Sequence, residues 1–134
     1  MDFRDTPEQA AFRAEAAAWL DEALRGFAHA SDGKAREEQS IAWQARLHRD
    51  GWAGIAWPEA YGGRGLGHVH DAIFNEEAVK RDAPMPINVI GVNLVGPTIM
   101  VHGTDEQKKR YLPRILSGEE VWCQGFSEPG AGSD

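Results

Sequence analysis

The same helix-start signal occurs near both ends of the sequence, and it constrains the fold more than any other feature. Thr-Pro-Glu-Gln occupies residues 6–9 and Thr-Asp-Glu-Gln occupies residues 104–107. In such a capping box the threonine hydroxyl accepts from the glutamine amide, and the glutamine side chain accepts from the threonine amide. Apolar residues follow each box at helical spacing. We therefore predict amphipathic helices over about 6–27 and 104–118.

Three further segments have helical character. The spacing of apolar residues predicts helices over about 35–50 and 68–81, and a strongly apolar helix over 87–101. Proline lacks a backbone N–H, so Gly96-Pro97 should kink or restart the third of these helices, and Pro113 should kink or split the helix over 104–118. Segment 87–101 is apolar on all sides, which implies that protein covers every side or that a ligand lies along one of them.

The remaining segments complete an all-α prediction. Residues 51–67 are rich in glycine and aromatic residues, which predicts an ordered loop packed over the core. Residues 121–127 have the pattern of a strand, but this sequence offers that strand no partner. We predict an N-terminal helical bundle domain of about five helices over residues 1–118. Residues 119–134 would form the first strand and a turn of a β-domain that the sequence does not contain.

Composition excludes several classes of function. A length of 134 residues suits one domain, and the net charge of −7 argues against nonspecific nucleic-acid binding. A single cysteine allows no internal disulfide, which favours a reducing compartment. No window has the roughly 18 apolar residues of a membrane span, and the N-terminus lacks the apolar region of a signal peptide. We therefore expect a cytoplasmic protein that binds neither membrane nor nucleic acid.

Few residues suggest chemistry on their own. The five histidines have no Cys, Asp or Glu at metal-ligand spacing, so we predict no metal site. The segment Ser-Glu-Pro-Gly-Ala-Gly-Ser-Asp at 127–134 combines hydroxyls with glycines, which can leave backbone N–H groups available to an anion or a cofactor. The same composition equally suits a simple β-turn between two strands. Both interpretations remain open from the residues alone.

A longer pattern adds a family resemblance. Cys-Gln-Gly-Phe-Ser-Glu-Pro-Gly-Ala-Gly-Ser-Asp at 123–134 resembles the signature with which the acyl-CoA dehydrogenase family enters its middle β-domain. Residues 51–66 resemble the loop after that family's second helix, and residues 96–119 resemble the last helices of its N-terminal domain. The resemblance implies a helical domain, a middle β-domain and a C-terminal four-helix bundle. It also implies FAD bound between the last two domains and across a subunit boundary.

The resemblance also implies roles for particular residues. Ser127 matches the residue whose hydroxyl bonds the flavin ring, and Gln124 and Phe126 match positions whose backbone touches that ring. Ser133 matches the serine near the FAD pyrophosphate and the CoA portion of the substrate. The positions that line the far end of the acyl pocket match Ile87, Ile90 and Leu94, although packing in the core would explain these aliphatic residues equally well. The catalytic glutamate of the family lies in its C-terminal bundle, so no residue here is assigned a catalytic role.

The implied function is α,β-dehydrogenation of an acyl-CoA thioester in fatty acid and lipid metabolism, with hydride transfer to FAD. Electron-transfer flavoprotein would be the electron acceptor, and the protein would form a homo- or hetero-oligomer, either a dimer or a tetramer such as a homotetramer. The 134 residues alone are expected to be inactive and to bind FAD poorly. Two alternatives remain: other flavin chemistry on the same scaffold, as in an acyl-CoA oxidase or a flavin monooxygenase, and a helical interaction domain without enzymatic activity.

Overall fold

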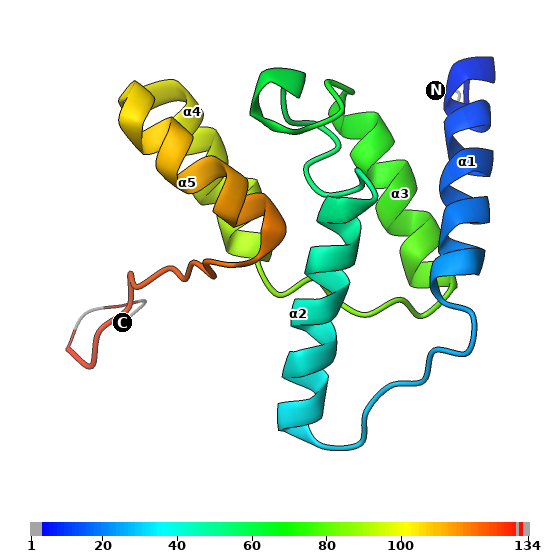
Figure 1. Ribbon diagram of the computed structural model, residues 1–134, viewed down its shortest axis with the longest axis horizontal. Helices are drawn as coiled ribbons and strands as arrows, with labels where there is room; N and C mark the ends of the chain where they lie inside the picture. Colours follow the sequence, from blue (N-terminus) through cyan, green and yellow to red (C-terminus); the bar gives the residue numbers. More distant parts are fainter. Residues whose placement is uncertain (1–3, 131, 133–134) are drawn as a thin grey trace.

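The described part of the chain, residues 4–130 and 132 of a computed structural model, is built from helices (Figure 1). It contains no regular strand, which confirms the predicted all-α class. A 3-10 helix η1 and a π-helix η2 accompany the α-helices. The elements in chain order are α1 (Pro7–Ala23), α2 (Gly33–Arg49), η1 (Glu59–Tyr61), α3 (His68–Lys80), η2 (Gly91–Val95), α4 (Gly96–His102) and α5 (Asp105–Ser117).

Both predicted capping boxes are confirmed. The Thr6 hydroxyl accepts from the Gln9 amide at 3.2 Å, and the Gln9 side chain accepts from the Thr6 amide at 2.9 Å. Thr104 and Gln107 make the equivalent pair of bonds at the start of α5, at 3.3 and 2.8 Å. Helix α5 continues through Pro113 to Ser117, so the expected split does not occur.

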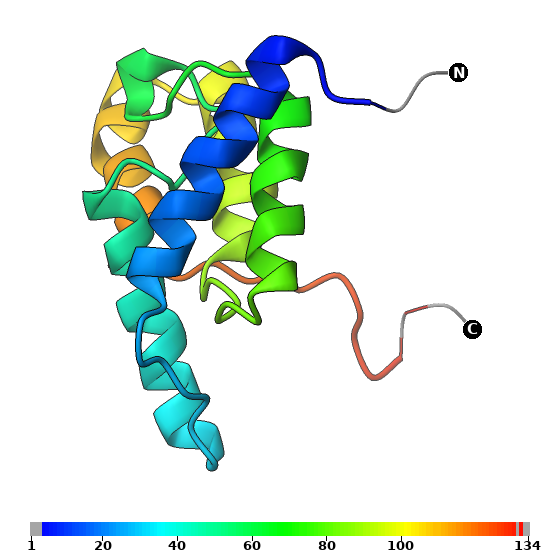
Figure 2. The same cartoon turned by 90° about the vertical axis from the view of Figure 1, so that its right-hand side faces the viewer.

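The helices meet pairwise around one core. Helix α1 lies along α3, and α5 contacts both α2 and α4. Figure 2 shows α1 and α3 running beside each other, while Figure 1 places α2 between that pair and the pair formed by α4 and α5. The buried apolar residues come from α1, α2, α3, α5 and the loop after α2. They are Phe12, Ala16, Leu20, Ala23, Trp43, Leu47, Trp52, Ala53, Ile55, Trp57, Ile73, Phe74, Leu112, Ile115 and Leu116.

The glycine-rich segment 51–67 is the ordered loop that the sequence predicts. Its apolar side chains Trp52, Ile55 and Trp57 are buried in the core. The Trp52 ring stacks on Phe74 of α3, with ring centroids 5.0 Å apart. The loop therefore fills the space among α1, α3 and α5 and contributes to the domain's stability, because buried aromatic residues remove large apolar areas from water.

The apolar segment 87–101 differs from its prediction. Helical structure begins at Val89, so Ile87 lies in a turn before it and does not share a helix face with Ile90 and Leu94. The predicted restart at Gly96-Pro97 is confirmed, because α4 begins at Gly96. The pattern did not predict the π-helix η2 that immediately precedes it. The segment is also not covered on all sides, because Leu94 is 48% exposed.

Residues 121–127 do not form the predicted strand. They run as irregular coil that leads away from the helices (Figure 1). A strand needs a neighbour to share its backbone hydrogen bonds, and the described residues provide none. The division into domains at residue 118 stays a prediction.

Candidate functional site

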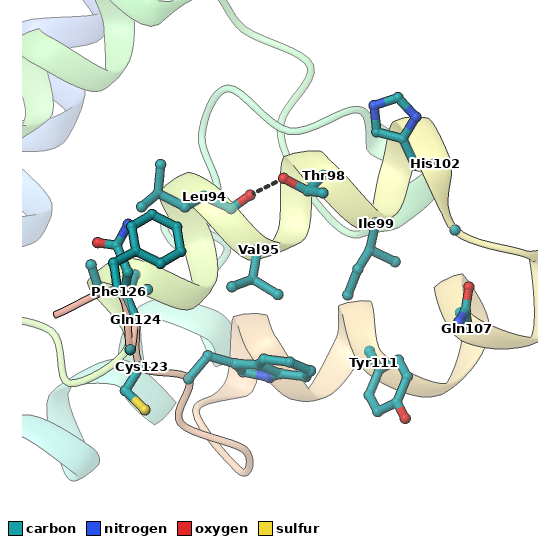
Figure 3. A pocket seen from close by; sticks show the side chains of 14 residues that line it. Leu94, Val95, Thr98, Ile99, His102, Gln107, Tyr111, Cys123, Gln124 and Phe126 are labelled. Atoms are coloured by element: carbon teal, nitrogen blue, oxygen red, sulfur yellow. Dashed lines mark hydrogen bonds between the residues drawn. The ribbon is translucent and has the colours of Figure 1, made fainter. Parts of the chain in front are cut away.

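A groove of about 800 Å³ lies where η2 and α4 face α5, and the coil after α5 closes one of its ends (Figure 3). Three stretches of chain contribute to its walls: 90–103, 107–111 and 122–126. The lining residues are Ile90, Leu94, Val95, Thr98, Ile99, His102, Gly103, Gln107, Tyr111, Trp122, Cys123, Gln124, Gly125 and Phe126.

The middle of the groove is apolar. Val95 and Ile99 project from η2 and α4 towards α5, as Figure 3 shows. Opposite them, the Trp122 ring meets Tyr111 edge to face, with centroids 5.5 Å apart. The polar groups His102 and Gln107 lie at the end away from Phe126 (Figure 3). Such a surface suits an apolar ligand with a few polar contacts.

The groove brings together four of the seven residues that the sequence singles out. Ile90 and Leu94 lie on its helical wall, and Gln124 and Phe126 lie at the end formed by the coil. These two pairs are about thirty residues apart in the sequence, so the fold alone makes them neighbours. The side chain of Phe126 is 84% exposed.

The other three residues are placed differently. Ile87 and Ser127 do not line the groove. Ile87 lies close to Gly118, since a Cβ atom placed on that glycine would be 3.6 Å from the Ile87 Cγ2 atom. Ser133 lies outside the described residues.

The coil offers backbone donors to a ligand. The amides of residues 123–127 donate no hydrogen bond to any other described residue. Backbone amides that lack a protein partner bond to water or to a ligand, and a flavin ring carries oxygen and nitrogen acceptors. This part of the chain therefore fits a flavin edge, with the hydroxyl of Ser127 as an additional donor.

Sequence reasoning missed the residue that fixes the start of this coil. Asn88 is fully buried, and its amide group bonds the backbone of Ile115, Glu120 and Trp122. One signal could have revealed it, because Asn88 is a polar residue inside the otherwise apolar run at 87–92. A buried amide needs hydrogen-bond partners, so such a residue marks a contact with distant backbone.

His102 is the imidazole that lines the groove, and the described lining offers no carboxylate as a base. Nor do three or more His, Cys, Asp or Glu side chains come together anywhere in residues 4–130 and 132 to hold a metal ion. The same residues include no helix long and apolar enough to cross a membrane. The groove can therefore hold and orient an apolar group, while a carboxylate for proton transfer would have to come from elsewhere.

Comparison with known proteins gives a consistent result. Residues 6–119 match the family model described as "Acyl-CoA dehydrogenase, N-terminal domain". The chain is 45% identical over 130 residues to the acyl-CoA dehydrogenase IpdE1 of Mycobacterium tuberculosis. That match covers 92% of this chain and 34% of the relative, so the chain spans about a third of the length of this relative.

Two solved structures resemble the chain in fold and in sequence. One is the ChsE4-ChsE5 complex from Mycobacterium tuberculosis, with 37% identity and a TM-score of 0.76 over 98% of this chain and 33% of that chain. The other is described as "Tcur3481-Tcur3483 steroid ACAD", with 35% identity and a TM-score of 0.71 over 98% of this chain and 34% of that chain.

Proposed function

Because this chain belongs to the acyl-CoA dehydrogenase family, we propose that it forms the N-terminal part of an FAD-dependent oxidoreductase. This enzyme would introduce a double bond between the α and β carbons of an acyl-CoA thioester. The observation that supports the proposal is the groove, where Ile90 and Leu94 share one cavity with Gln124 and Phe126. An acyl-binding wall and a flavin-binding segment would have to meet in this way for the reaction to occur.

We assign the residues of this chain to binding and orientation. Ile90 and Leu94 would contact the acyl group, and the apolar middle of the groove would exclude water from it. The backbone at Gln124 and Phe126, with the Ser127 hydroxyl, would donate hydrogen bonds to the flavin ring. FAD, when bound, accepts the hydride that leaves the β carbon.

Two of the residues assigned from the sequence are not among those that line the groove. Ser133 would contact the FAD pyrophosphate and the CoA portion of the substrate. Ile87 would support the acyl wall from behind, because it lies in the turn before Ile90 and close to Gly118.

The catalytic base would come from a part of the protein beyond this sequence. The chain spans about a third of the relatives it matches, and no carboxylate lines the described groove. We propose residues 1–118 as the helical domain and residues 119–134 as the start of the middle β-domain. A glutamate in a following helical bundle would remove the α proton. Electron-transfer flavoprotein would then reoxidise the flavin.

We further propose that the enzyme assembles with another subunit. One similar solved structure is described as the ChsE4-ChsE5 complex, and the description of the other joins two protein names, Tcur3481 and Tcur3483. A second subunit would also cover the coil at 122–126, where the 84% exposed Phe126 presents an apolar ring to solvent. Leu94, which is 48% exposed, lines the same groove as Phe126, and exposed apolar residues that form a contiguous patch mark a contact surface.

The acyl group is proposed to be bulky. One similar solved structure is described as a steroid ACAD. The groove of about 800 Å³ lies in the range of cavities that hold drug-sized ligands. A polycyclic acyl thioester of steroid origin is therefore the substrate class that we propose for this site.

Titration with FAD tests the proposal that the flavin site is shared with the rest of the protein. Each hydrogen bond from the coil contributes about 0.5–1.5 kcal/mol net, whereas association costs roughly 4–15 kcal/mol in lost freedom. The 134-residue chain should therefore cause no saturable change in FAD fluorescence at micromolar concentrations, where binding needs about −8 kcal/mol. The protein encoded by the gene together with its codons after Asp134 should bind FAD. A gene that stops at Asp134, or a longer protein that does not bind FAD, would contradict the proposed function.

A further inference from the structure

The side chain of Asn88 ties the coil at 120–122 to the turn that precedes η2. Its Nδ2 donates to the carbonyl of Ile115 at 2.8 Å and to that of Glu120 at 2.9 Å. Its Oδ1 accepts from the backbone N–H of Trp122 at 2.9 Å. A carbonyl can only accept and an amide N–H can only donate, so these partners fix the orientation of the amide group.

The surroundings of Asn88 leave it no alternative partner or position. The residue has no exposed surface. The loss of its amide would leave the buried Ile115 carbonyl and two half-buried backbone groups, those of Glu120 and Trp122, without these hydrogen bonds. Gly91 follows one turn later, and a Cβ atom there would lie 2.3 Å from the Asn88 Oδ1. Glycine at 91 therefore leaves the space that the side-chain amide of Asn88 occupies. On the other side, Arg110 holds the Glu120 carboxylate at 2.6 Å.

The position of this contact in the chain connects both walls of the groove. Asn88 precedes Ile90 by two residues, and Ile90 lies on the wall assigned to the acyl group. Trp122 is two residues before Gln124, in the segment assigned to the flavin. The three hydrogen bonds therefore set the separation between these two walls at the point where the coil leaves α5.

We propose that Asn88 is a positioning residue that holds the flavin-binding coil at a fixed distance from the acyl-binding helix. This proposal rests on the proposed function, since it assigns flavin and acyl group to the two walls. A displacement of about 1 Å between reacting groups can lower a rate about a hundredfold. The loss of this contact should therefore lower the rate of flavin reduction in addition to lowering the stability of the fold.

Asn88→Leu is the test substitution, because leucine has a similar volume and no hydrogen-bonding groups. The matched control is Gln44→Leu: Gln44 is also buried, and its Nε2 donates to the carbonyl of Leu116 at 2.8 Å. Both substitutions remove a buried amide that bonds the end of α5, but only Asn88 contacts the coil. Asn88→Ala serves as a second variant if the leucine variant does not fold, because it also removes the acceptor for Trp122 and both amide donors, with a smaller side chain.

The first measurement uses the 134-residue chain, because its residues form a buried apolar core among themselves. Hydrogen exchange by NMR should show the Trp122 amide exchanging at least about tenfold faster in Asn88→Leu relative to the Leu20 amide in the core. Gln44→Leu should leave this ratio unchanged. An unchanged ratio in both Asn88 variants would overturn the proposal, whatever the flavin results.

The second measurement uses the longer FAD-containing protein. Stopped-flow reduction by acyl-CoA should be at least about tenfold slower in Asn88→Leu, while Gln44→Leu should reduce at the normal rate despite the loss of its own buried hydrogen bond. Equal rates in the two variants would show that Asn88 only stabilises the fold, and would overturn the proposal. If the unmodified protein binds no FAD, the proposed function fails; if it binds FAD and the variants behave alike, the positioning role alone fails.

Discussion

The indole Nε1 of Trp57 donates a hydrogen bond to the backbone carbonyl of Val92 at 3.0 Å. In η2 the amide of Gly96 donates to the carbonyl of Gly91, five residues earlier. The same spacing would require residue 97 to donate to the carbonyl of Val92. Residue 97 is proline and has no N–H. The loop tryptophan therefore satisfies a carbonyl that the π-helix leaves without a partner, and π-helices of this kind are frequent at functional sites.

We expect Trp57→Phe to destabilise the domain by about 1–3 kcal/mol beyond the loss of apolar area, because the Val92 carbonyl would lose its partner. Trp43→Phe is the matched control, since Trp43 is similarly buried and its indole has no hydrogen bond to another described residue. Urea unfolding followed by circular dichroism measures both. Equal losses in the two variants would show that this hydrogen bond does not stabilise η2.

The position of Trp57 also explains Gly96. A Cβ atom on residue 96 would lie 2.1 Å from the Trp57 Cζ2 atom, so the indole can reach Val92 only if residue 96 has no side chain. The Gly-Pro pair at 96–97 thus has two effects. Glycine at 96 leaves space for the Trp57 indole, and proline at 97 leaves the Val92 carbonyl without a backbone donor.

A buried carboxylate joins α1 to α3. Glu77 accepts from Lys80 at 2.7 Å, from Arg13 of α1 at 3.0 Å and from Arg81 at 2.6 Å. The hydrogen bond from Lys80, followed by those from Arg13 and Arg81, lowers the pKa of Glu77 to about 2 against the opposing effect of burial. The unfolded chain would have a glutamate pKa of about 4.3.

The lowered pKa of Glu77 predicts a loss of stability in acid. A group with a lowered pKa in the folded state stabilises the protein fully above its unfolded pKa, and this contribution disappears as the pH falls towards the folded value. The free energy of unfolding should therefore decline between about pH 5 and pH 2, and Glu77→Gln should make that decline shallower. Urea midpoints across this range measure the effect. Glu37→Gln, at an exposed position of α2 without an ion pair to another described residue, should leave the decline unchanged.

Ser127→Ala tests the hydroxyl assigned to the flavin. In the longer protein it should weaken FAD retention by roughly two- to tenfold, the effect of one hydrogen bond, or slow flavin reduction. Ser40→Ala on α2 provides a control far from the groove in sequence and outside its lining. Equilibrium dialysis and stopped-flow reduction measure the two effects. Normal retention together with normal reduction would remove Ser127 from the flavin site.

Leu94→Trp tests the width of the groove. Leu94 lines the helical wall and is 48% exposed, so a larger side chain there fills the groove without disturbing the core. We expect kcat/KM for a steroid-derived acyl-CoA to fall at least about tenfold, and that for a straight-chain acyl-CoA to change much less. Val89→Trp, on the same helical segment but outside the lining, is the control. Equal losses for both substrates would contradict a bulky acyl group.

Local signals in the sequence predicted much of the fold. The capping boxes at Thr6 and Thr104 place two helix starts correctly, since their bonds join residues only three apart. The aromatic content of residues 51–67 correctly indicates a packed loop. The capping boxes depend only on neighbours in the chain, and the large apolar side chains of the loop must be buried somewhere in any compact fold.

Features that depend on distant contacts were not predicted. The π-helix before Pro97 is bonded by the indole of Trp57, and the sequence pattern of 87–101 contains no sign of that partner. The turn at Ile87 follows from Asn88, whose three backbone partners lie at 115–122. The shared groove could be predicted only through the family resemblance, because periodicity does not show which segments of chain meet.

Anaerobic reduction of the bound flavin by acyl-CoA distinguishes an acyl-CoA dehydrogenase from a protein with another function. The protein encoded through and beyond Asp134 is mixed with a steroid-derived or a straight-chain acyl-CoA in the absence of oxygen, and the absorbance of oxidised flavin is followed. We expect this absorbance to be lost, with one enoyl-CoA formed per flavin reduced. Flavin that stays oxidised with both thioesters, or that a nicotinamide cofactor reduces in their place, would contradict an acyl-CoA dehydrogenase function.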